Sequence, residues 1–221
     1  MGTLDNSKRF WMRLVNRAAR AKIISRRMDA LYLLQDPWGM NSPSEQSRFA
    51  ETNRLLLEKF GHVGSLLEVG CGEGHQSIYL RHICDTLTGL DICGRAVERA
   101  RTRHPGGRYI VGDLFSPAIA DLAHFDLVMA CEVLYYINDL EAALRRMREL
   151  GRNGFVTYFD KMMEKLDPLV LSLPGVSSEI LKIGDACWRA VWWSERSSRI
   201  VMPAAPKERR YLKPRSIDEL V

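Results

Sequence analysis

The sequence predicts an α/β fold in which a doubly wound, mostly parallel sheet ends in an antiparallel β-hairpin. Three observations predict it. From residue 65 onward, short apolar runs alternate with helix-like segments, as in parallel sheets covered on both faces. A glycine triplet separates the first of these strands from the following helix. Near residue 185, two β-rich runs flank a short glycine turn, which is the pattern of a hairpin.

The N-terminal part is predicted to be helical. Residues 7–34 keep roughly helical spacing of apolar side chains and read as one helix or two. The segment Asp36-Pro37-Trp38-Gly39 ends this element, because proline disfavours helix in the residue before it. Serine at a cap, proline in the first turn and a close acid at 42–45 then predict a second helix that runs to about Phe60.

The alternating part follows in order. Helices are expected at 75–84, 95–104 and 140–150, between the strands. The predicted strands are 66–69, 86–91, 108–111, 125–130 and 154–159, and the hairpin joins 179–183 to 187–193 through 184–186. This arrangement is typical of a Rossmann-like sheet.

The amino-acid composition limits the class of protein. With 221 residues, 46% of them hydrophobic, the chain is large enough for one globular domain with a substantial core. No apolar run is long enough for a transmembrane helix. The five cysteines are odd in number and form no C-x-x-C pair, which argues against a disulfide framework or a structural zinc site. We therefore expect a cytoplasmic protein with reduced thiols and no metal.

Positive charge is concentrated at the two ends. Between Ser7 and Asp29 there are eight basic residues and one acid, and the segment 196–215 is also basic. We therefore expect a basic N-terminal helical extension at 1–35, a catalytic domain at 36–195 and a basic tail at 196–221. One interpretation of the first helix is purely structural: its apolar side chains pack on the domain. The other is peripheral docking on an anionic membrane or an acidic partner.

The glycine segment Gly70-x-Gly72-x-Gly74 has the features of a ligand loop. Glycines there allow a tight turn and close approach of the backbone, and the helix start offers free N–H groups. The spacing differs from the G-x-G-x-x-G of dinucleotide sites, and a plain turn is the alternative. Asp91 ends the next predicted strand, where an acid can accept both ribose hydroxyls of an adenosine.

These motifs resemble those of class I S-adenosylmethionine (SAM) dependent methyltransferases. Residues 67–74 look like the first motif of that family and 90–92 like the second. Residues 112–114 look like the third motif, whose acid holds the adenine amino group, and 125–136 like the fourth. The resemblance covers about residues 45–193 and implies SAM as cofactor, with S-adenosylhomocysteine (SAH) as its product.

A narrower set of residues is similar to the NodS-like methyltransferases. That group includes nodulation enzymes that N-methylate a deacetylated chitooligosaccharide, so the resemblance implies a saccharide-type acceptor. The segment after Phe159 matches this group poorly. The shared residues are Asp36-Pro37-Trp38-Gly39, Glu45, Arg48, Cys84, Asp85, Leu87, Asp91, Ile92, Ala96, Val97, Ala100, Arg101 and Glu132-Val133-Leu134-Tyr135-Tyr136.

The resemblance assigns a cofactor site, and several of its members have a structural alternative. The acids and Arg48 are candidates for the ribose, the adenine, the ammonium and the carboxylate of SAM; a capping, turn or solvated role is the alternative for Glu68, Asp113 and Arg48. Trp38 is either a lid or a hinge. The candidate cofactor residues are Trp38, Arg48, Glu68, Gly70, Cys71, Gly72, Gly74, Asp91, Ile92, Asp113, Leu114 and Cys131.

Three residues are candidates for catalysis. Glu132, after the fourth strand, would steer the acceptor or serve as a base. Tyr135 would line the acceptor pocket, with ordinary packing as the alternative. His75 is a candidate base, with a surface or capping role as the alternative.

The sequence thus predicts methyl transfer from SAM to an oxygen or nitrogen of a small-molecule or saccharide-type acceptor. A nucleic-acid methyltransferase is the second reading, favoured by the basic ends. The absence of a recognition motif and of an N-P-P-Y or D-P-P-Y segment argues against it. The third reading is a non-catalytic SAM-binding interaction module. The sequence leaves the acceptor and the oligomeric state open.

Overall fold

The computed structural model describes residues 28–120, 122 and 124–195. The predicted basic helix at 7–34 lies mostly outside these residues, and so does the predicted tail at 196–221. Residues 28–31, which belong to that predicted helix, are helical. The domain boundaries at 35 and 195 stay predictions. Among the described residues, no helix is both long and apolar enough to cross a membrane.

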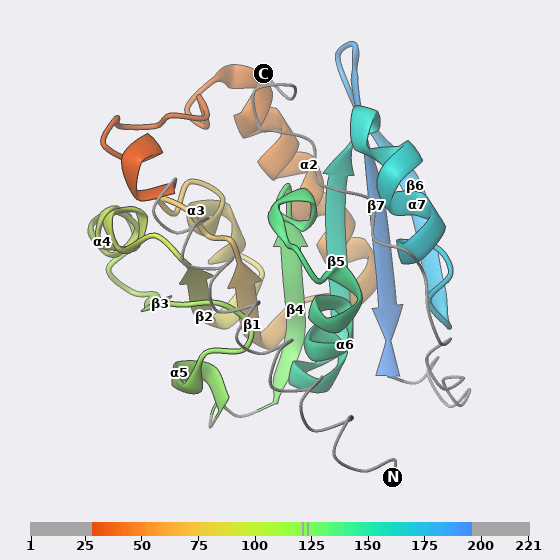
Figure 1. The fold of residues 1–221 in the computed structure, drawn as a ribbon. Coiled ribbons are helices and arrows are strands. Elements are labelled where there is room, and N and C mark those ends of the chain that lie inside the picture. The colour runs from red at the N-terminus through yellow and green to blue at the C-terminus, as the bar shows by residue number, and fades with distance from the viewer. Residues whose placement is uncertain (1–27, 121, 123, 196–221) are drawn as a thin grey trace, which may run out of the picture.

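A seven-stranded sheet forms the centre of the molecule, in the order β3-β2-β1-β4-β5-β7-β6 (Figure 1). The first five strands in this order are parallel, whereas β7 pairs antiparallel with both β5 and β6. The predicted fold class is therefore confirmed. The strands are β1 Val63–Val69, β2 Cys84–Asp91, β3 Arg108–Val111, β4 Phe125–Cys131, β5 Gly151–Phe159, β6 Val176–Ile183 and β7 Ala186–Ser194.

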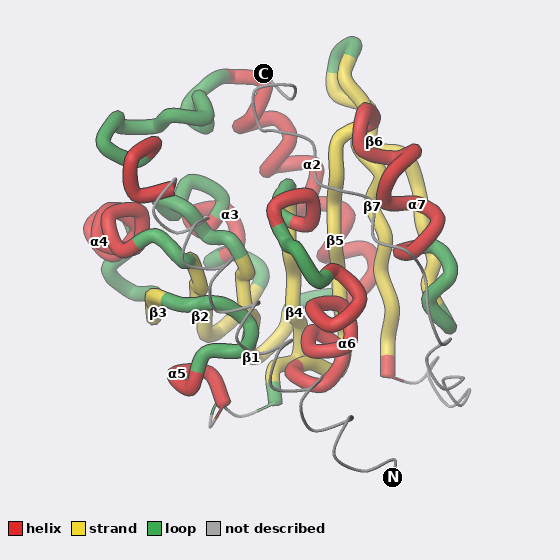
Figure 2. The backbone as a smooth tube through the Cα atoms, viewed as in Figure 1, coloured by secondary structure: helices red, strands yellow, loops and turns green. Residues whose placement is uncertain are grey.

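Helices cover both faces of the sheet (Figure 2). One hydrophobic cluster joins α5, α6 and α7 to one face, and a second joins α2 and α3 to the other. The alternation of side chains along each strand divides neighbouring leucines between the two clusters: Leu66 belongs to the second and Leu67 to the first. The helices are α2 Pro43–Phe60, α3 Ser77–Leu80, α4 Gly94–Arg103, α5 Pro117–Ala120, α6 Leu140–Leu150 and α7 Met163–Val170.

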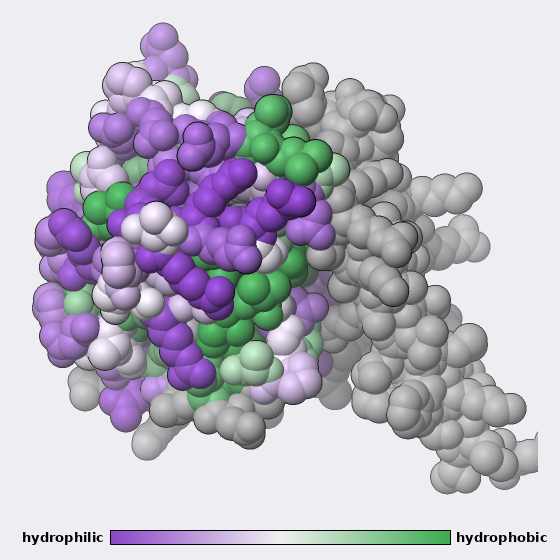
Figure 3. Space-filling view, turned by 90° about the vertical axis from the view of Figure 1, so that its left-hand side faces the viewer, coloured by the Kyte–Doolittle hydropathy of each residue, from purple (hydrophilic) through white to green (hydrophobic). Residues whose placement is uncertain are grey.

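The helix ends follow local chemistry. Ser42 caps α2 by accepting a hydrogen bond from the Glu45 amide at 3.4 Å, and Pro43 occupies the first turn, as the sequence predicts. Asp139 caps α6 in the same way, through the Ala142 amide at 3.1 Å. The outer side of α4 carries arginines, and this face of the molecule is mostly hydrophilic (Figure 3).

The structure differs from the predicted elements in three places. The helix expected at 75–84 contains only Ser77–Leu80, because the residues before it form a loop and β2 begins at Cys84. The short helix α5 was not predicted. The segment after Phe159 contains α7, which includes Pro168 and was not predicted either.

The strand order indicates where a binding crevice should lie. Strands β1 and β4 are neighbours, yet the chain continues from β1 to β2 on one side and from β4 to β5 on the other. Connections therefore diverge at the carboxyl ends of β1 and β4. Open parallel sheets bind ligands at such a switch point.

Candidate active site

A cavity of about 280 Å³ lies at this switch point. It is formed by the carboxyl ends of β1, β2 and β4, the start of α2 and the segment 28–40. The structure brings together almost all predicted site residues here, although they come from well-separated stretches of the chain. Those that line the cavity are Trp38, Arg48, Glu68, Gly70, Cys71, Gly72, His75, Asp91, Ile92, Asp113, Leu114, Cys131, Glu132 and Tyr135.

The glycine loop turns tightly at the end of β1. Gly70 and Gly72 have φ values of 74° and 51°, a region that favours glycine. A β-carbon on Gly70 would lie 2.0 Å from Val133 Cγ2, so no side chain fits there. Gly74 differs from the other two, because it does not line the cavity. Its β-carbon would lie 3.1 Å from Ala100, so this glycine lets the loop pack closely on α4.

Asp91 at the end of β2 holds the glycine loop through backbone amides. Its Oδ2 accepts a hydrogen bond from the Gly72 amide and its Oδ1 from the Cys93 amide, both at 2.9 Å. Burial raises the pKa of this carboxyl, although the amide donors oppose the shift. Each carboxylate oxygen retains a lone pair for a further donor, such as a ribose hydroxyl.

Asp113 and Leu114 follow β3 and serve two purposes. Asp113 Oδ1 accepts hydrogen bonds from the Phe115 amide at 2.9 Å and from Ser116 Oγ at 3.1 Å, so Asp113 is a turn aspartate that also lines the cavity. Leu114 is buried in the core cluster and lines the cavity as well. A structural role and a role in binding the cofactor are therefore compatible for both residues.

Glu68 lies in β1 beneath the loop. It is 4% exposed and accepts a hydrogen bond from Ser77 Oγ at the start of α3. Burial raises its pKa to about 8, and the nearby Asp91 carboxylate acts in the same direction. Burial also raises the pKa of the Cys71 thiol, next to it in the cavity.

Glu132 occupies the opposite side of the cavity, directly after β4. Its φ of 58° is unusual for a residue with a side chain and turns it back toward the sheet. Thr157 Oγ1 donates to Glu132 Oε1 and the Tyr135 hydroxyl donates to Glu132 Oε2, both at 3.2 Å. Burial raises the pKa of Glu132, whereas the nearby Arg48 guanidinium lowers it.

Arg48 reaches the cavity from α2. It is 3% exposed, which rules out the solvated alternative for this residue. Its Nε and Nη2 donate to Glu45 Oε2 at 2.8 and 2.6 Å, and its guanidinium carbon lies 4.8 Å from the centre of the Phe49 ring. Its Nη1 has no hydrogen-bond partner among the described residues.

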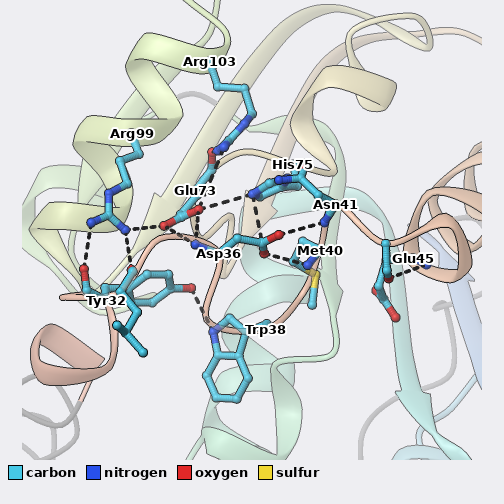
Figure 4. A network of polar contacts seen from close by, with 12 residues as sticks. Tyr32, Asp36, Trp38, Met40, Asn41, Glu45, Glu73, His75, Arg99 and Arg103 are labelled. Atoms are coloured by element: carbon cyan, nitrogen blue, oxygen red, sulfur yellow. Dashed lines mark hydrogen bonds and ion pairs between the residues drawn. The ribbon is translucent and has the colours of Figure 1, made fainter.

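Aromatic rings cover the cavity. Trp38 Nε1 donates to the Tyr32 hydroxyl at 3.2 Å (Figure 4). The Trp38 ring lies 5.9 Å from that of Tyr136. Tyr136 in turn lies 4.6 Å from the Tyr135 ring. Trp38 therefore spans the distance between the segment before α2 and the segment after β4.

Glu73 fixes this covering segment to the glycine loop (Figure 4). It accepts hydrogen bonds from the Asp36 amide and from Arg99, and His75 Nε2 lies 3.2 Å from its Oε2. Burial alone would raise the pKa of Glu73, but these donors outweigh it and lower the pKa. Arg99 also donates to the carbonyls of Tyr32 and Leu34.

This network bears on the prediction for His75 and includes a residue that was not predicted. His75 contacts Glu73 and lies 3.8 Å from Asp36, which favours the capping alternative over a role as base. The sequence analysis missed Glu73 and Gln76, although both stand within or next to the glycine motif. Their position between the loop and a helix was the available signal.

Comparisons with known proteins agree with this geometry. Residues 67–159 match the family model described as a methyltransferase domain. Nodulation protein S of Bradyrhizobium diazoefficiens is 33% identical over 121 residues, which cover 52% of this chain and 56% of that protein. Malonyl-[acyl-carrier protein] O-methyltransferase of Pseudescherichia vulneris is 27% identical over 154 residues, or 64% of this chain and 61% of that protein. The chain thus spans between about half and three fifths of the length of these curated relatives.

Solved structures share the fold. The N-methyltransferase NodS from Bradyrhizobium japonicum WM9 in complex with SAH has a TM-score of 0.63 at 22% identity, covering 77% of this chain and 97% of that one. The magnesium protoporphyrin IX methyltransferase from Synechocystis PCC 6803 with bound SAM has a TM-score of 0.60 at 15% identity, covering 79% and 97%. Residues 67–159 thus match a methyltransferase domain, and the fold is shared with methyltransferases that bind SAM or SAH. Over about half of its length the chain is also similar to nodulation protein S.

Proposed function

We propose that this protein transfers the methyl group of SAM to an amine nitrogen of a saccharide-type small molecule. The observation that carries the proposal is the half-buried Glu132 carboxylate at the end of β4, which faces the cavity beside the glycine loop. The choice of nitrogen also draws support from NodS, a fold neighbour described as an N-methyltransferase, whereas the saccharide-type acceptor draws support from the resemblance to the NodS-like group.

The residues of the cavity fit SAM. Gly70 and Gly72 let the backbone turn tightly along the cavity, and Asp91 offers acceptors for ribose hydroxyls. Ile92 and Leu114 provide apolar contact for the adenine next to Asp113. When bound, SAM supplies an activated methyl group on a sulfonium, so the protein has to align the acceptor with it.

Charge around Glu132 favours an amine acceptor. The carboxylates of Glu45 and Glu132 both act on the guanidinium of Arg48, so acids outnumber the base here. Excess negative charge attracts a cationic amine and repels an anionic acceptor. Both Glu132 oxygens are oriented by hydroxyl donors, so the carboxylate is ready to accept an N–H hydrogen bond and to hold the proton that the amine loses.

A second candidate is methylation of a carboxyl oxygen. The unpartnered Nη1 of Arg48 is suited to an anionic acceptor, and some relatives are named as malonyl-[acyl-carrier protein] O-methyltransferases. The excess of carboxylates around Arg48 argues against this alternative.

An acceptor panel tests the choice. Purified protein is incubated with SAM labelled in its methyl group and with glucosamine oligomers, N-acetylglucosamine oligomers, a malonyl thioester or RNA. We expect label in the glucosamine oligomers alone, since acetylation removes the nucleophilic amine. Label in the thioester would support the second candidate, and label in RNA would support the nucleic-acid reading. A lack of transfer to every acceptor, including a whole-cell metabolite extract, would leave a SAM-binding module.

The basic segment before the domain stays a separate proposal. Eight basic residues between Ser7 and Asp29 favour attraction to an anionic membrane surface, worth about 1 kcal/mol for each residue near it. Co-sedimentation with anionic vesicles at low salt, lost at high salt, is the expected result. Failure to bind at low salt would leave only a packing role.

A further inference from the structure

A second cavity, of about 240 Å³, adjoins the cavity of the candidate active site. Three side chains, those of Met40, Phe49 and His75, line both cavities and so separate one from the other. Apart from His75, no residue of the predicted site lines the second cavity, which therefore lies outside the recognised motifs. Its other polar or aromatic lining residues are Asn41, Gln46, Tyr79 and His82.

A series of side-chain contacts leads from Glu132 to the second cavity. Glu132 and Arg48 interact electrostatically, and the Arg48 guanidinium carbon lies 4.8 Å from the centre of the Phe49 ring. The Phe49 ring in turn lies 5.4 Å from that of Tyr79, which lines the second cavity but not the first. A ligand that occupies both cavities must therefore consist of at least two linked units.

Met40 is the adaptable part of the separating layer. Its main chain is held, because Asp36 accepts hydrogen bonds from the amides of Met40 and Asn41 at 2.6 and 2.9 Å (Figure 4). Its side chain is half-buried, unbranched and able to adopt several shapes. Rotation of this side chain can widen the passage between the cavities without any movement of the backbone.

The two cavities differ in charge. Acidic side chains, among them Asp91 and Glu132, line the cavity of the candidate active site. Within the part of the chain that the structure describes, no Asp, Glu, Lys or Arg side chain lines the second cavity. The first cavity therefore favours a cationic group, whereas the second suits an uncharged ligand.

The lining of the second cavity suits a ring that carries hydroxyl groups. Gln46 Nε2 donates to the Asn41 carbonyl at 3.0 Å, which leaves the Gln46 side-chain oxygen and the Asn41 side-chain amide available. The Tyr79 hydroxyl has no hydrogen-bond partner among the described residues. Amides and hydroxyls can each pair with a hydroxyl, which both donates and accepts, while the aromatic rings offer apolar surface to the C–H face of a sugar.

We propose that the second cavity binds an uncharged sugar ring linked to the amine-bearing ring of the acceptor, with Tyr79 as a specificity-determining residue. This assignment rests on the proposed function. It makes the protein selective for acceptors of two or more rings, since a single amino sugar occupies only the cavity beside Glu132.

Steady-state kinetics with two acceptors tests the assignment. One is glucosamine, and the other is a disaccharide of glucosamine linked to an uncharged hexose. For wild type we expect a KM about tenfold lower for the disaccharide, from one aromatic contact and its hydrogen bonds. Tyr79→Ala should remove this advantage and leave both the KM for glucosamine and the Kd for SAH unchanged.

A second variant avoids any effect of Tyr79 on packing. Gln46 is exposed, so Gln46→Ala should fold normally and raise the KM for the disaccharide a few-fold, in line with one lost hydrogen bond. Ser47→Ala is the matched control, because Ser47 is an exposed neighbour on α2 that lines neither cavity. If Tyr79→Ala also weakens SAH binding, the comparison of Gln46→Ala with Ser47→Ala decides alone.

Two outcomes would overturn the assignment. The first is an equal KM for both acceptors in wild type, and the second is a wild-type preference for the disaccharide that persists in Gln46→Ala. Failure of the proposed function has a different signature. Neither acceptor would then be methylated, but ligand-observed NMR would still detect binding of N-acetylglucosamine to wild type and its loss in Tyr79→Ala.

Discussion

The two walls of the cavity are built in different ways. The wall at the ends of β1 and β2 is mainly backbone, with Gly70 and Gly72 held by amide hydrogen bonds to Asp91 and to the Leu90 carbonyl. The wall after β4 consists of side chains, where Glu132 meets Tyr135 and the Trp38 cover. A backbone wall binds any ligand whose hydrogen-bonding groups match its amides and carbonyls, whereas a side-chain wall selects a ligand by charge and shape. We infer that the first serves the shared cofactor and the second the particular acceptor.

The largest expected effect is on kcat, and it comes from a change in the side-chain wall. Glu132→Gln keeps the shape of the side chain but removes the proton acceptor, so kcat should fall roughly a hundredfold while SAH affinity is preserved. Steady-state kinetics and calorimetry measure the two quantities. Glu141→Gln, an exposed change on α6, is the control and should alter neither. Loss of SAH affinity in Glu132→Gln would show that the walls do not divide the two tasks.

The reverse experiment addresses the backbone wall. Asp91→Ala should weaken SAH binding by roughly 1.5–3 kcal/mol, because the ribose hydroxyls lose a charged acceptor and the amides of Gly72 and Cys93 lose theirs. Asp85→Ala, at the exposed opposite end of β2, is the matched control. Unchanged affinity in Asp91→Ala would contradict the assignment of this acid.

Glycine substitutions test how tightly the backbone wall fits. Gly39 and Gly70 both have φ near 70°, but a β-carbon on Gly39 meets nothing within 4 Å. Gly39→Ala should therefore cost only the backbone strain of about 1–2 kcal/mol. Gly70→Ala adds the clash with Val133, a further 1–3 kcal/mol or so. Urea unfolding compares the two, and equal losses would mean that the loop relaxes around the new methyl group.

Buried acid beneath the backbone wall makes stability depend on pH. The folded-state pKa of Glu68 is raised to about 8, so between about pH 4.5 and 8 the folded protein binds more protons at this site than the unfolded chain. Stability at this site therefore falls as pH rises through that range, by at most about 1.4 kcal/mol per pH unit.

Glu68→Gln removes this dependence. The free energy of unfolding of this variant minus that of wild type should be larger at pH 8 than at pH 5, because only wild type loses stability over that range. Urea titrations at both values measure this difference, and Glu164→Gln on the exposed side of α7 should show none. A constant difference across the range would mean that Glu68 stays ionised in the fold.

The same contrast explains what the sequence could predict. The backbone wall is encoded by consecutive residues, so the motif at 67–74 and Asp91 are enough to predict it. The close packing of Gly74 on Ala100 could not be predicted, because it depends on how α4 packs; a cofactor role for Gly74 stays a prediction. The side-chain wall joins segments more than eighty residues apart, such as those of Arg48 and Glu132, and a local sequence pattern does not encode their contact. For the same reason the sequence did not predict the burial of Arg48, the hydrogen-bond network around Glu73 or helix α7.

Trp38 tests the edge where the two walls meet, and its expected effect is the smallest. As a lid, its ring contacts Tyr136, so Trp38→Ala should raise acceptor KM by a few-fold, in line with about 0.5–1.5 kcal/mol for an aromatic pair. Trp38→Phe keeps a ring but loses the hydrogen bond to Tyr32, and should leave KM close to wild type. As a hinge packed on the core, Trp38 would behave differently: both variants would lower the free energy of unfolding and neither would change KM. Its 38% exposure favours the lid, since a hinge residue of this size would be more deeply buried.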